Sequence, residues 1–265
     1  MQLHFNKIGN GPALIILHGL YGSGDNWYHI AKALSEKFTV YLVDQRNHGL
    51  SPHTASHSYE EMTDDLKLLI DSEKLVDICL IGHSMGGKTA MSYTLQFGAK
   101  VKTLINVDIA PYSYHGLEHF NQQFRYHQSI IERFLTAPIR STNNRNEIEE
   151  HFAKKITNVE TRRFLLKNLK REKEGSFSWK LNVHTISNSL DNVIDAAPPI
   201  KLGAQGFTNT LFIRGGNSPY ISDEDIESIP DIFPNCSFRT YEKSGHWLHA
   251  EEPERFIKDV MEFLC

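Results

Sequence analysis

The apolar positions divide the chain into three stretches, and the first is a sheet pattern. Segments with helical periodicity near residues 25–35, 60–73 and 85–97 alternate there with short runs rich in β-branched and aromatic residues. The five runs are LHFNKI, ALIILHG, FTVYLVD, VDICLIGHS and VKTLINVD. Because strand, turn and helix alternate and the runs are continuously apolar, the pattern predicts a mostly parallel sheet with helices on both faces.

The second stretch begins near residue 113 and is polar and amphipathic, with no strand pattern of comparable strength. The sheet pattern returns at TLFIRGG and CSFRTYEKSGH and is followed by a terminal helix, EEPERFIKDVMEFLC. We therefore predict an α/β core of residues 1–112 and 201–265. Residues 113–200 are predicted to form a helical cap insertion, and DAAPPIKLGAQGF a return linker.

The segment IGHSMGGKT matches two motifs. From Gly82 to Gly86 it is G-x-S-x-G, the turn that exposes a nucleophilic serine between a strand and a helix. From Gly82 to Thr89 it is G-x-x-x-x-G-K-T, a phosphate-binding loop. A nucleotide site also needs a carboxylate for Mg²⁺, for which Asp44 or Asp108 could serve, but such a loop usually opens its core. Here about three strand patterns precede it.

A serine hydrolase makes more demands on the chain, and each has a candidate residue. Ser84, Asp108 and His246 occur in the order nucleophile, acid, base, and His246 follows the last strand pattern in SGHW. Two backbone N–H groups must also hold the oxyanion of the reaction. Met85, directly after the serine, and Leu20, in LHGLYGSGDNW, are the candidate donors. The pattern therefore favours hydrolysis over nucleotide binding.

Six strings spread along the core resemble one known family. They are HGLYGSGDNW, VDQRNHGLSP, GHSMGGK, NVDIAPY, RGGNSPY and SGHWLHAEEPE, and together they are similar to the α/β-hydrolase superfamily, most closely to its bacterial YbfF-type esterases. The resemblance implies an α/β-hydrolase fold and a serine esterase or thioesterase that needs no cofactor. Asn47 stands where the family usually has glycine, a mild departure because asparagine tolerates a left-handed backbone.

The position of the acid departs from the usual family pattern. In most α/β-hydrolases the acid follows the strand that is TLFIRGG here, but Asn217 and Ser218 stand at that place. Asp223 comes several residues later and is expected to open a helix. Asp108 aligns with the displaced acid of the resembling subfamily, and we predict it as the third member of the triad.

Two further residues are predicted near the triad. Ser218 could donate a hydrogen bond to the acid or to the histidine. Trp247, next to His246, could either form a wall of the acyl pocket or pack against the core.

Composition limits the partners that we expect. The 265 residues carry a net charge of -4 with a pI near 6.4, which gives no footprint for nucleic acid or an anionic membrane. The N-terminus lacks a signal-peptide pattern, and no apolar run approaches the roughly 18 residues of a membrane helix. Cys79, Cys236 and Cys265 have no disulfide or metal spacing. We expect a cytoplasmic protein with a small ester or thioester substrate.

No metal or organic cofactor is predicted. His115 and His119 lie four residues apart, but the motif lacks the glutamate position of H-E-x-x-H and a third ligand. The mechanism of a serine hydrolase requires neither a metal nor a cofactor.

The cap contains one biased segment. Eight basic residues but only two glutamates occur between residues 154 and 173; the basic residues are Lys154, Lys155, Arg162, Arg163, Lys167, Lys170, Arg171 and Lys173. They could attract the phosphates of an acyl-CoA, or simply form a solvated helix face. Three functional alternatives also stay open: a C–C bond hydrolase, a cofactor-free haloperoxidase, or a non-catalytic binding protein with the same fold.

Overall fold

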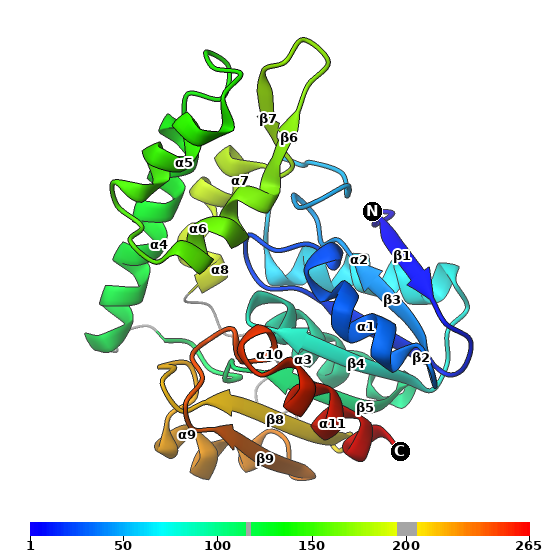
Figure 1. The fold of residues 1–265 in the computed structure, drawn as a ribbon. Helices are drawn as coiled ribbons and strands as arrows, with labels where there is room; N and C mark the ends of the chain where they lie inside the picture. Colours follow the sequence, from blue (N-terminus) through cyan, green and yellow to red (C-terminus); the bar gives the residue numbers. More distant parts are fainter. Residues whose placement is uncertain (115–117, 195–205) are drawn as a thin grey trace.

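A seven-stranded sheet forms the centre of the computed structural model, which describes residues 1–114, 118–194 and 206–265 (Figure 1). Its strands follow the order β1-β3-β2-β4-β5-β8-β9, and every neighbouring pair is parallel except β1 with β3. The strands are β1 (Phe5–Ile8), β2 (Ala13–Leu17), β3 (Thr39–Val43), β4 (Ile78–His83), β5 (Val101–Val107), β8 (Asn209–Gly215) and β9 (Cys236–Tyr241). The predicted mostly parallel sheet is confirmed.

Helices cover both faces of this sheet, and the alternation of side chains along each strand explains why. Leu14 and Ile16 of β2 pack in one apolar cluster with the first and last helices, whereas Ile15 and Leu17 pack in the other. The helices beside the sheet are α1 (Tyr28–Leu34), α2 (Tyr59–Ser72), α3 (Met85–Phe97), α9 (Asp223–Ser228), α10 (Leu248–Glu251) and α11 (Pro253–Leu264). Short 3₁₀ turns add η1 (Gly24–Trp27), η2 (Gly98–Lys100) and η4 (Ile229–Asp231).

The elements between β5 and β8 stand together on one side of the sheet (Figure 1). They are α4 (Glu118–Thr136), α5 (Arg145–Ala153), α6 (Val159–Leu165), η3 (Leu166–Asn168), β6 (Leu169–Arg171), β7 (Phe177–Trp179), α7 (Val183–Asn188) and α8 (Leu190–Ile194). We call them the cap. The antiparallel β6–β7 hairpin is an addition that the sequence did not predict, because strands of three residues leave no readable alternation.

Parts of the predicted organisation lie outside the described residues. Most of the return linker falls within residues 195–205, and so does the predicted boundary at residue 200. His115, one of the two histidines weighed as metal ligands, falls within residues 115–117. The domain boundaries stay a prediction. Of the helices that are described, none combines the length and apolar content needed to cross a membrane.

Candidate active site

Ser84 lies in a strained turn between β4 and α3. Its backbone has φ 53° and ψ -117°, and its N–H donates to the carbonyl of Val107 at 3.1 Å. A Cβ atom on Gly82 would lie 2.4 Å from the carbonyl oxygen of Gly86, and one on Gly86 would lie 2.4 Å from that of Leu17. Only glycine fits at these two places, so the turn presses the serine outward at the start of α3.

The phosphate-loop motif is not supported by the position of its lysine. Lys88 is fully buried in α3, with its ammonium 4.7 Å from the ring centre of Tyr114 and 5.8 Å from that of Tyr59. A phosphate-binding lysine must reach the anion at the loop itself. The structure therefore favours the serine turn, with Lys88 as a residue of the helix interior.

Asp108 accepts three hydrogen bonds although its side chain is completely buried. Its Oδ1 accepts from the backbone N–H of Gly215 at 2.8 Å, and its Oδ2 accepts from Nδ1 of His246 at 2.7 Å. The hydroxyl of Ser218 also donates to Oδ2. These donors compensate the loss of water around the carboxylate. The structure thus brings three of the predicted residues, Asp108, His246 and Ser218, into direct contact.

Asp223, the other carboxylate near the usual family position, points elsewhere. It is the first residue of α9, behind the N-cap Ser222, and its carboxylate pairs with Arg214 at 2.7 Å. With 87% of its side chain exposed, Asp223 is a surface residue and not a partner of the histidine.

His246 is held on both its ring and its backbone. Its ring centre lies 4.2 Å from that of Tyr220 and 4.6 Å from that of His83. Nε2 of His83 donates to the carbonyl oxygen of His246 at 2.9 Å. Burial and neighbouring histidines keep the pKa of His83 well below its usual value, so this ring stays neutral. The contacts restrict His246 to an orientation set by Asp108.

The two predicted oxyanion donors flank the serine. Met85 directly follows it and opens α3, and Leu20 follows Gly19 in the loop after β2. A Cβ atom on Gly19 would lie 3.2 Å from Cβ of Ser84, so the backbone before Leu20 packs directly on the serine turn. Leu20, Ser84 and Met85 line one recess. That their N–H groups hold an oxyanion stays a prediction.

The serine and histidine open into a cavity of about 210 Å³ between core and cap. Trp247 lies in its wall and also contacts Phe164 of α6, with 5.5 Å between ring centres. Trp247 therefore lines the cavity and packs on the cap, and a role for it in binding the acyl group stays a prediction. No three potential metal-ligating side chains cluster among the described residues.

Sequence reasoning missed a polar cluster in the same cavity. His127 of α4 bonds through Nδ1 to the hydroxyl of Tyr21 at 3.2 Å and through Nε2 to that of Tyr220 at 3.3 Å. Burial lowers the pKa of His127 to about 3, so its ring is neutral near pH 7. No signal marks this histidine in the sequence, because it occupies one position of a long amphipathic helix.

Comparisons with known proteins show the family of the chain. A family model described as alpha/beta hydrolase fold matches residues 12–253. The sn-1-specific diacylglycerol lipase ABHD11 of Danio rerio is 35% identical over 98% of this chain and 80% of its own. Esterase YbfF of Escherichia coli is 30% identical over 98% of this chain and 95% of its own. The likeness therefore does not single out YbfF-type esterases.

A solved structure at higher identity shows the same fold. A marine microorganism esterase superposes with a TM-score of 0.93 and 44% identity, covering 99% of each chain. An E-2-(acetamidomethylene)succinate hydrolase superposes with a TM-score of 0.79 at 17% identity and shows the fold alone.

Proposed function

The chain belongs to the α/β-hydrolase fold family and is a hydrolase of the esterase and lipase type, and on that premise we propose that it cleaves small carboxylic esters through an acyl-enzyme on Ser84. One observation carries the proposal. The hydrogen bond from His246 to the buried Asp108 lies beside the strained Ser84 turn, and the serine and histidine face a single cavity.

The proposed mechanism assigns each group one task. Ser84 Oγ attacks the ester carbonyl while Nε2 of His246 takes its proton, and Asp108 keeps the other proton on Nδ1 and stabilises the imidazolium. The N–H groups of Leu20 and Met85 bind the oxyanion, each typically worth about 2.7–4 kcal/mol. The proton then passes to the leaving alcohol, and water, activated by the same histidine, releases the acid.

The shape of the recess behind the serine supports a short acyl group. Apolar side chains such as Ile109 and Val193 line it together with the rings of Tyr59, His127 and Tyr220. Its volume is about 20 Å³, room for little more than one water molecule. The larger cavity of about 210 Å³ lies toward the cap and is left for the alcohol part. We therefore propose esters of short acids, although relatives carry names such as diacylglycerol lipase.

Labelling with a fluorophosphonate probe tests the proposal. The wild type should be labelled and should hydrolyse p-nitrophenyl acetate faster than the octanoate ester, and Ser84→Ala should do neither. A wild type that is not labelled would instead be a binding protein with this fold. Labelling without hydrolysis of any ester in a graded panel would favour a C–C bond hydrolase or a haloperoxidase.

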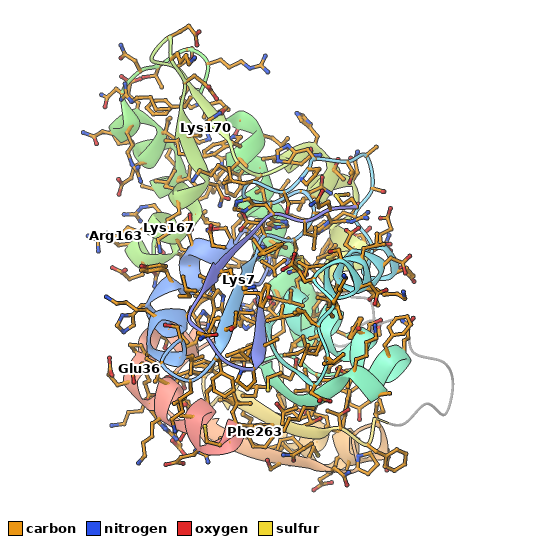
Figure 2. The ribbon with its side chains drawn as sticks, turned by 90° about the vertical axis from the view of Figure 1, so that its right-hand side faces the viewer. Lys7, Glu36, Arg163, Lys167, Lys170 and Phe263 are labelled. Carbon is orange, nitrogen blue, oxygen red and sulfur yellow. The ribbon has the colours of Figure 1, made fainter. Side chains whose placement is uncertain are left out.

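A thioester substrate is the second candidate, and the cap surface bears on it. Arg162 is unsuited to bind a phosphate, because its guanidinium donates to the carbonyls of Ile156 and Thr157, each at 2.8 Å. Arg163 and Lys167 are exposed and lie close together on the cap (Figure 2). Arg163 pairs with the exposed Glu160 at 2.8 Å, and such a surface ion pair is weak enough for a phosphate to replace it. We propose that these two residues, next to the part of α6 that lines the cavity, attract the phosphates of an acyl-CoA.

Charge reversal separates the thioester from the ester. In the double variant Arg163→Glu, Lys167→Glu, we expect the KM for acetyl-CoA to rise about fivefold and to lose its salt dependence. The KM for p-nitrophenyl acetate should stay unchanged. Lys154→Glu with Lys155→Glu is the matched control, since these lysines are exposed elsewhere on the cap. An unchanged KM for acetyl-CoA in the first double variant would contradict the thioester proposal.

A further inference from the structure

The loop that carries Leu20 is a tight turn in an unusual conformation. The N–H of Gly22 donates to the carbonyl of Gly19 at 3.0 Å, which closes a turn with Leu20 and Tyr21 at its centre. Tyr21, the third residue, has φ 65°. A positive φ at this position is typical of a type II turn and normally requires glycine or asparagine. A tyrosine stays there only if surrounding groups hold it.

The first peptide of the turn joins Gly19 to Leu20 and is held from the core. Its carbonyl oxygen accepts from Nδ1 of His18 at 2.9 Å as well as from Gly22. The C=O and N–H of a trans peptide point in opposite directions. The N–H of Leu20 is therefore directed away from His18, while the preceding Gly19 lies against Ser84.

The second peptide joins Leu20 to Tyr21 and is held by a neutral histidine. The N–H of Tyr21 donates to Nε2 of His48 at 3.3 Å, and Nδ1 of His48 contacts the carbonyl of Arg46 at 2.9 Å. A carbonyl can only accept, so Nδ1 carries the proton and Nε2 is free to accept. Burial, together with His18 and His57, keeps the pKa of His48 well below its usual value.

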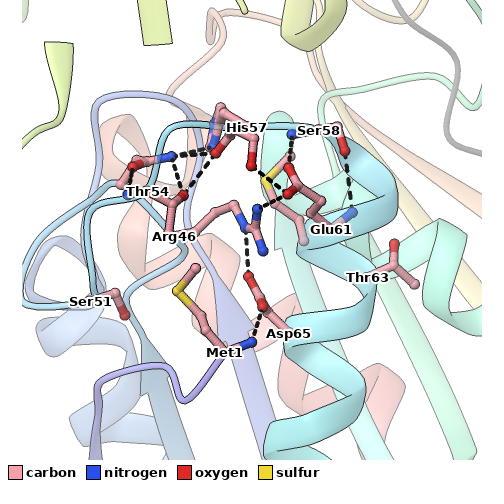
Figure 3. A network of polar contacts seen from close by, with 12 residues as sticks. Met1, Arg46, Ser51, Thr54, His57, Ser58, Glu61, Thr63 and Asp65 are labelled. Carbon is pink, nitrogen blue, oxygen red and sulfur yellow. Dashed lines mark hydrogen bonds and ion pairs between the residues drawn. The ribbon is translucent and has the colours of Figure 1, made fainter. Parts of the chain in front are cut away.

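The segment that carries His48 is itself anchored. Arg46 is buried, and its guanidinium pairs with Glu61 and Asp65 of α2, each at 2.7 Å (Figure 3). The carbonyl that fixes the tautomer of His48 therefore belongs to a residue tied to a long helix of the core.

The third peptide is held from the cap. Nδ2 of Asn168 donates to the carbonyl of Tyr21 at 2.8 Å and to that of Leu165 at 3.1 Å. Asn168 is 4% exposed and ends η3. One cap side chain thus bonds the backbone of the residue directly after the proposed oxyanion donor.

We propose that Asn168 of the cap and His48 of the core are positioning residues that hold this turn in the conformation presenting the Leu20 N–H to the oxyanion. Without them, Tyr21 can relax to a negative φ, which rotates the neighbouring peptide planes. The placement of the cap then sets the rate of the chemical step as well as access to the cavity. This inference rests on the proposed function of Ser84.

The structure offers a matched pair of variants. Asn182, also in the cap, donates from its Nδ2 to Oδ1 of Asn47 and to the carbonyl of Thr54, both at 2.9 Å, and does not touch the turn. Asn168→Asp and Asn182→Asp each remove two such bonds and add one charge. The kcat and KM for p-nitrophenyl acetate would be measured together with the Ki of a trifluoromethyl ketone, whose tetrahedral adduct requires the oxyanion site.

We expect Asn168→Asp to lower kcat about 10- to 100-fold, with KM changed less than threefold and the ketone bound correspondingly more weakly. Asn182→Asp should keep kcat within threefold of wild type. Equal kcat values for the two variants, at comparable melting temperatures, would overturn the inference.

A second pair of variants tests the core side of the turn, and its conservative member controls for misfolding. His48→Gln keeps a donor and an acceptor, so it should retain at least tenfold more kcat than His48→Leu. Equal kcat values in these two variants would contradict a positioning role for His48. If the wild type is not labelled at Ser84, the proposed function fails. If the wild type is active and the substitutions leave kcat unchanged, only this inference fails.

Discussion

The core and the cap both surround Ser84, but they hold their residues by different means. In the core, backbone conformation places the residues. Ser84 and Asp108 both have positive φ at the ends of neighbouring strands. In the cap, single side chains make the contacts, such as Asn168 with the turn at Tyr21 and Phe164 with Trp247. We therefore expect substitutions around Ser84 and Asp108 in the core to change the rate of the chemistry. Cap substitutions other than those at Asn168 should change which substrate binds.

The strongest test of this contrast is Asp108→Asn. Asparagine keeps the size of the side chain but can place an N–H toward His246, which would favour the wrong tautomer of the histidine. We expect kcat for p-nitrophenyl acetate to fall about 10³- to 10⁴-fold. Asp223→Asn is the control and should change kcat less than twofold, since Asp223 is exposed. The reverse order of effects would assign the acid to Asp223.

Ser218→Ala should have a smaller effect at the same carboxylate. It removes one of three donors to Asp108 and leaves those of Gly215 and His246 in place. We expect kcat to fall about 3- to 10-fold, in line with the loss of one hydrogen bond to a charged group. A pH profile of kcat/KM would locate the effect at His246. If kcat and the pH profile of the variant equalled those of wild type, Ser218 would not contribute to catalysis.

Where core meets cap, Trp247→Ala should affect binding more than chemistry. The ring lines the cavity and packs on Phe164, so its loss enlarges the space for the alcohol part of the ester. We expect the KM for a naphthyl ester to change about three- to fivefold while kcat for p-nitrophenyl acetate stays within twofold. Phe164→Ala should shift the same KM from the cap side. A large fall in kcat with Trp247→Ala would break the division between the two regions.

The last effects concern stability and leave the chemistry aside, and they come from buried histidines on both sides. Burial lowers the pKa of His57 in the core to about 4 and of His127 in the cap to about 3. Both are neutral in the folded protein but become protonated on unfolding below about pH 6.5. Their contribution is therefore complete above pH 6.5 and is lost as the pH falls, toward 4 for His57 and toward 3 for His127.

Urea unfolding at a series of pH values checks this dependence. Between pH 6 and 4 the free energy of unfolding should fall by about 1.4 kcal/mol per pH unit for each such histidine. His57→Gln removes one of these histidines, so it should reduce the slope by up to about 1.4 kcal/mol per pH unit. The same slope in wild type and variant would show that His57 is not neutral and buried as described.

Much of the core could be predicted from the sequence because its residues either follow a strand or helix period or belong to a recognisable motif. The strand runs alternate between two buried faces, and the glycines around Ser84 leave no alternative side chain. Asn47, expected to tolerate a left-handed backbone, has φ 65°. Asp108 was the harder case. It follows β5 and His246 follows β9, so their contact appears only when the order β5-β8-β9 of the sheet is known.

The cap could be predicted only as a series of helices. The number of basic residues does not predict that Arg162 donates to backbone carbonyls while Arg163 is exposed. Asn168 and His127 are single polar residues whose partners in the core lie over 90 positions away in the chain. Such pairings depend on how the cap sits on the core, which no local pattern records.

The three tryptophans lie in different parts of the protein, so intrinsic fluorescence can report on the contact between cap and core. Trp27 stacks on His249 within the core, Trp179 packs on Phe134 within the cap, and Trp247 lies at the junction of the two. With the first two replaced by phenylalanine, the emission of Trp247 would report the separation of cap and core. Stopped-flow fluorescence could then show whether the cap moves during turnover.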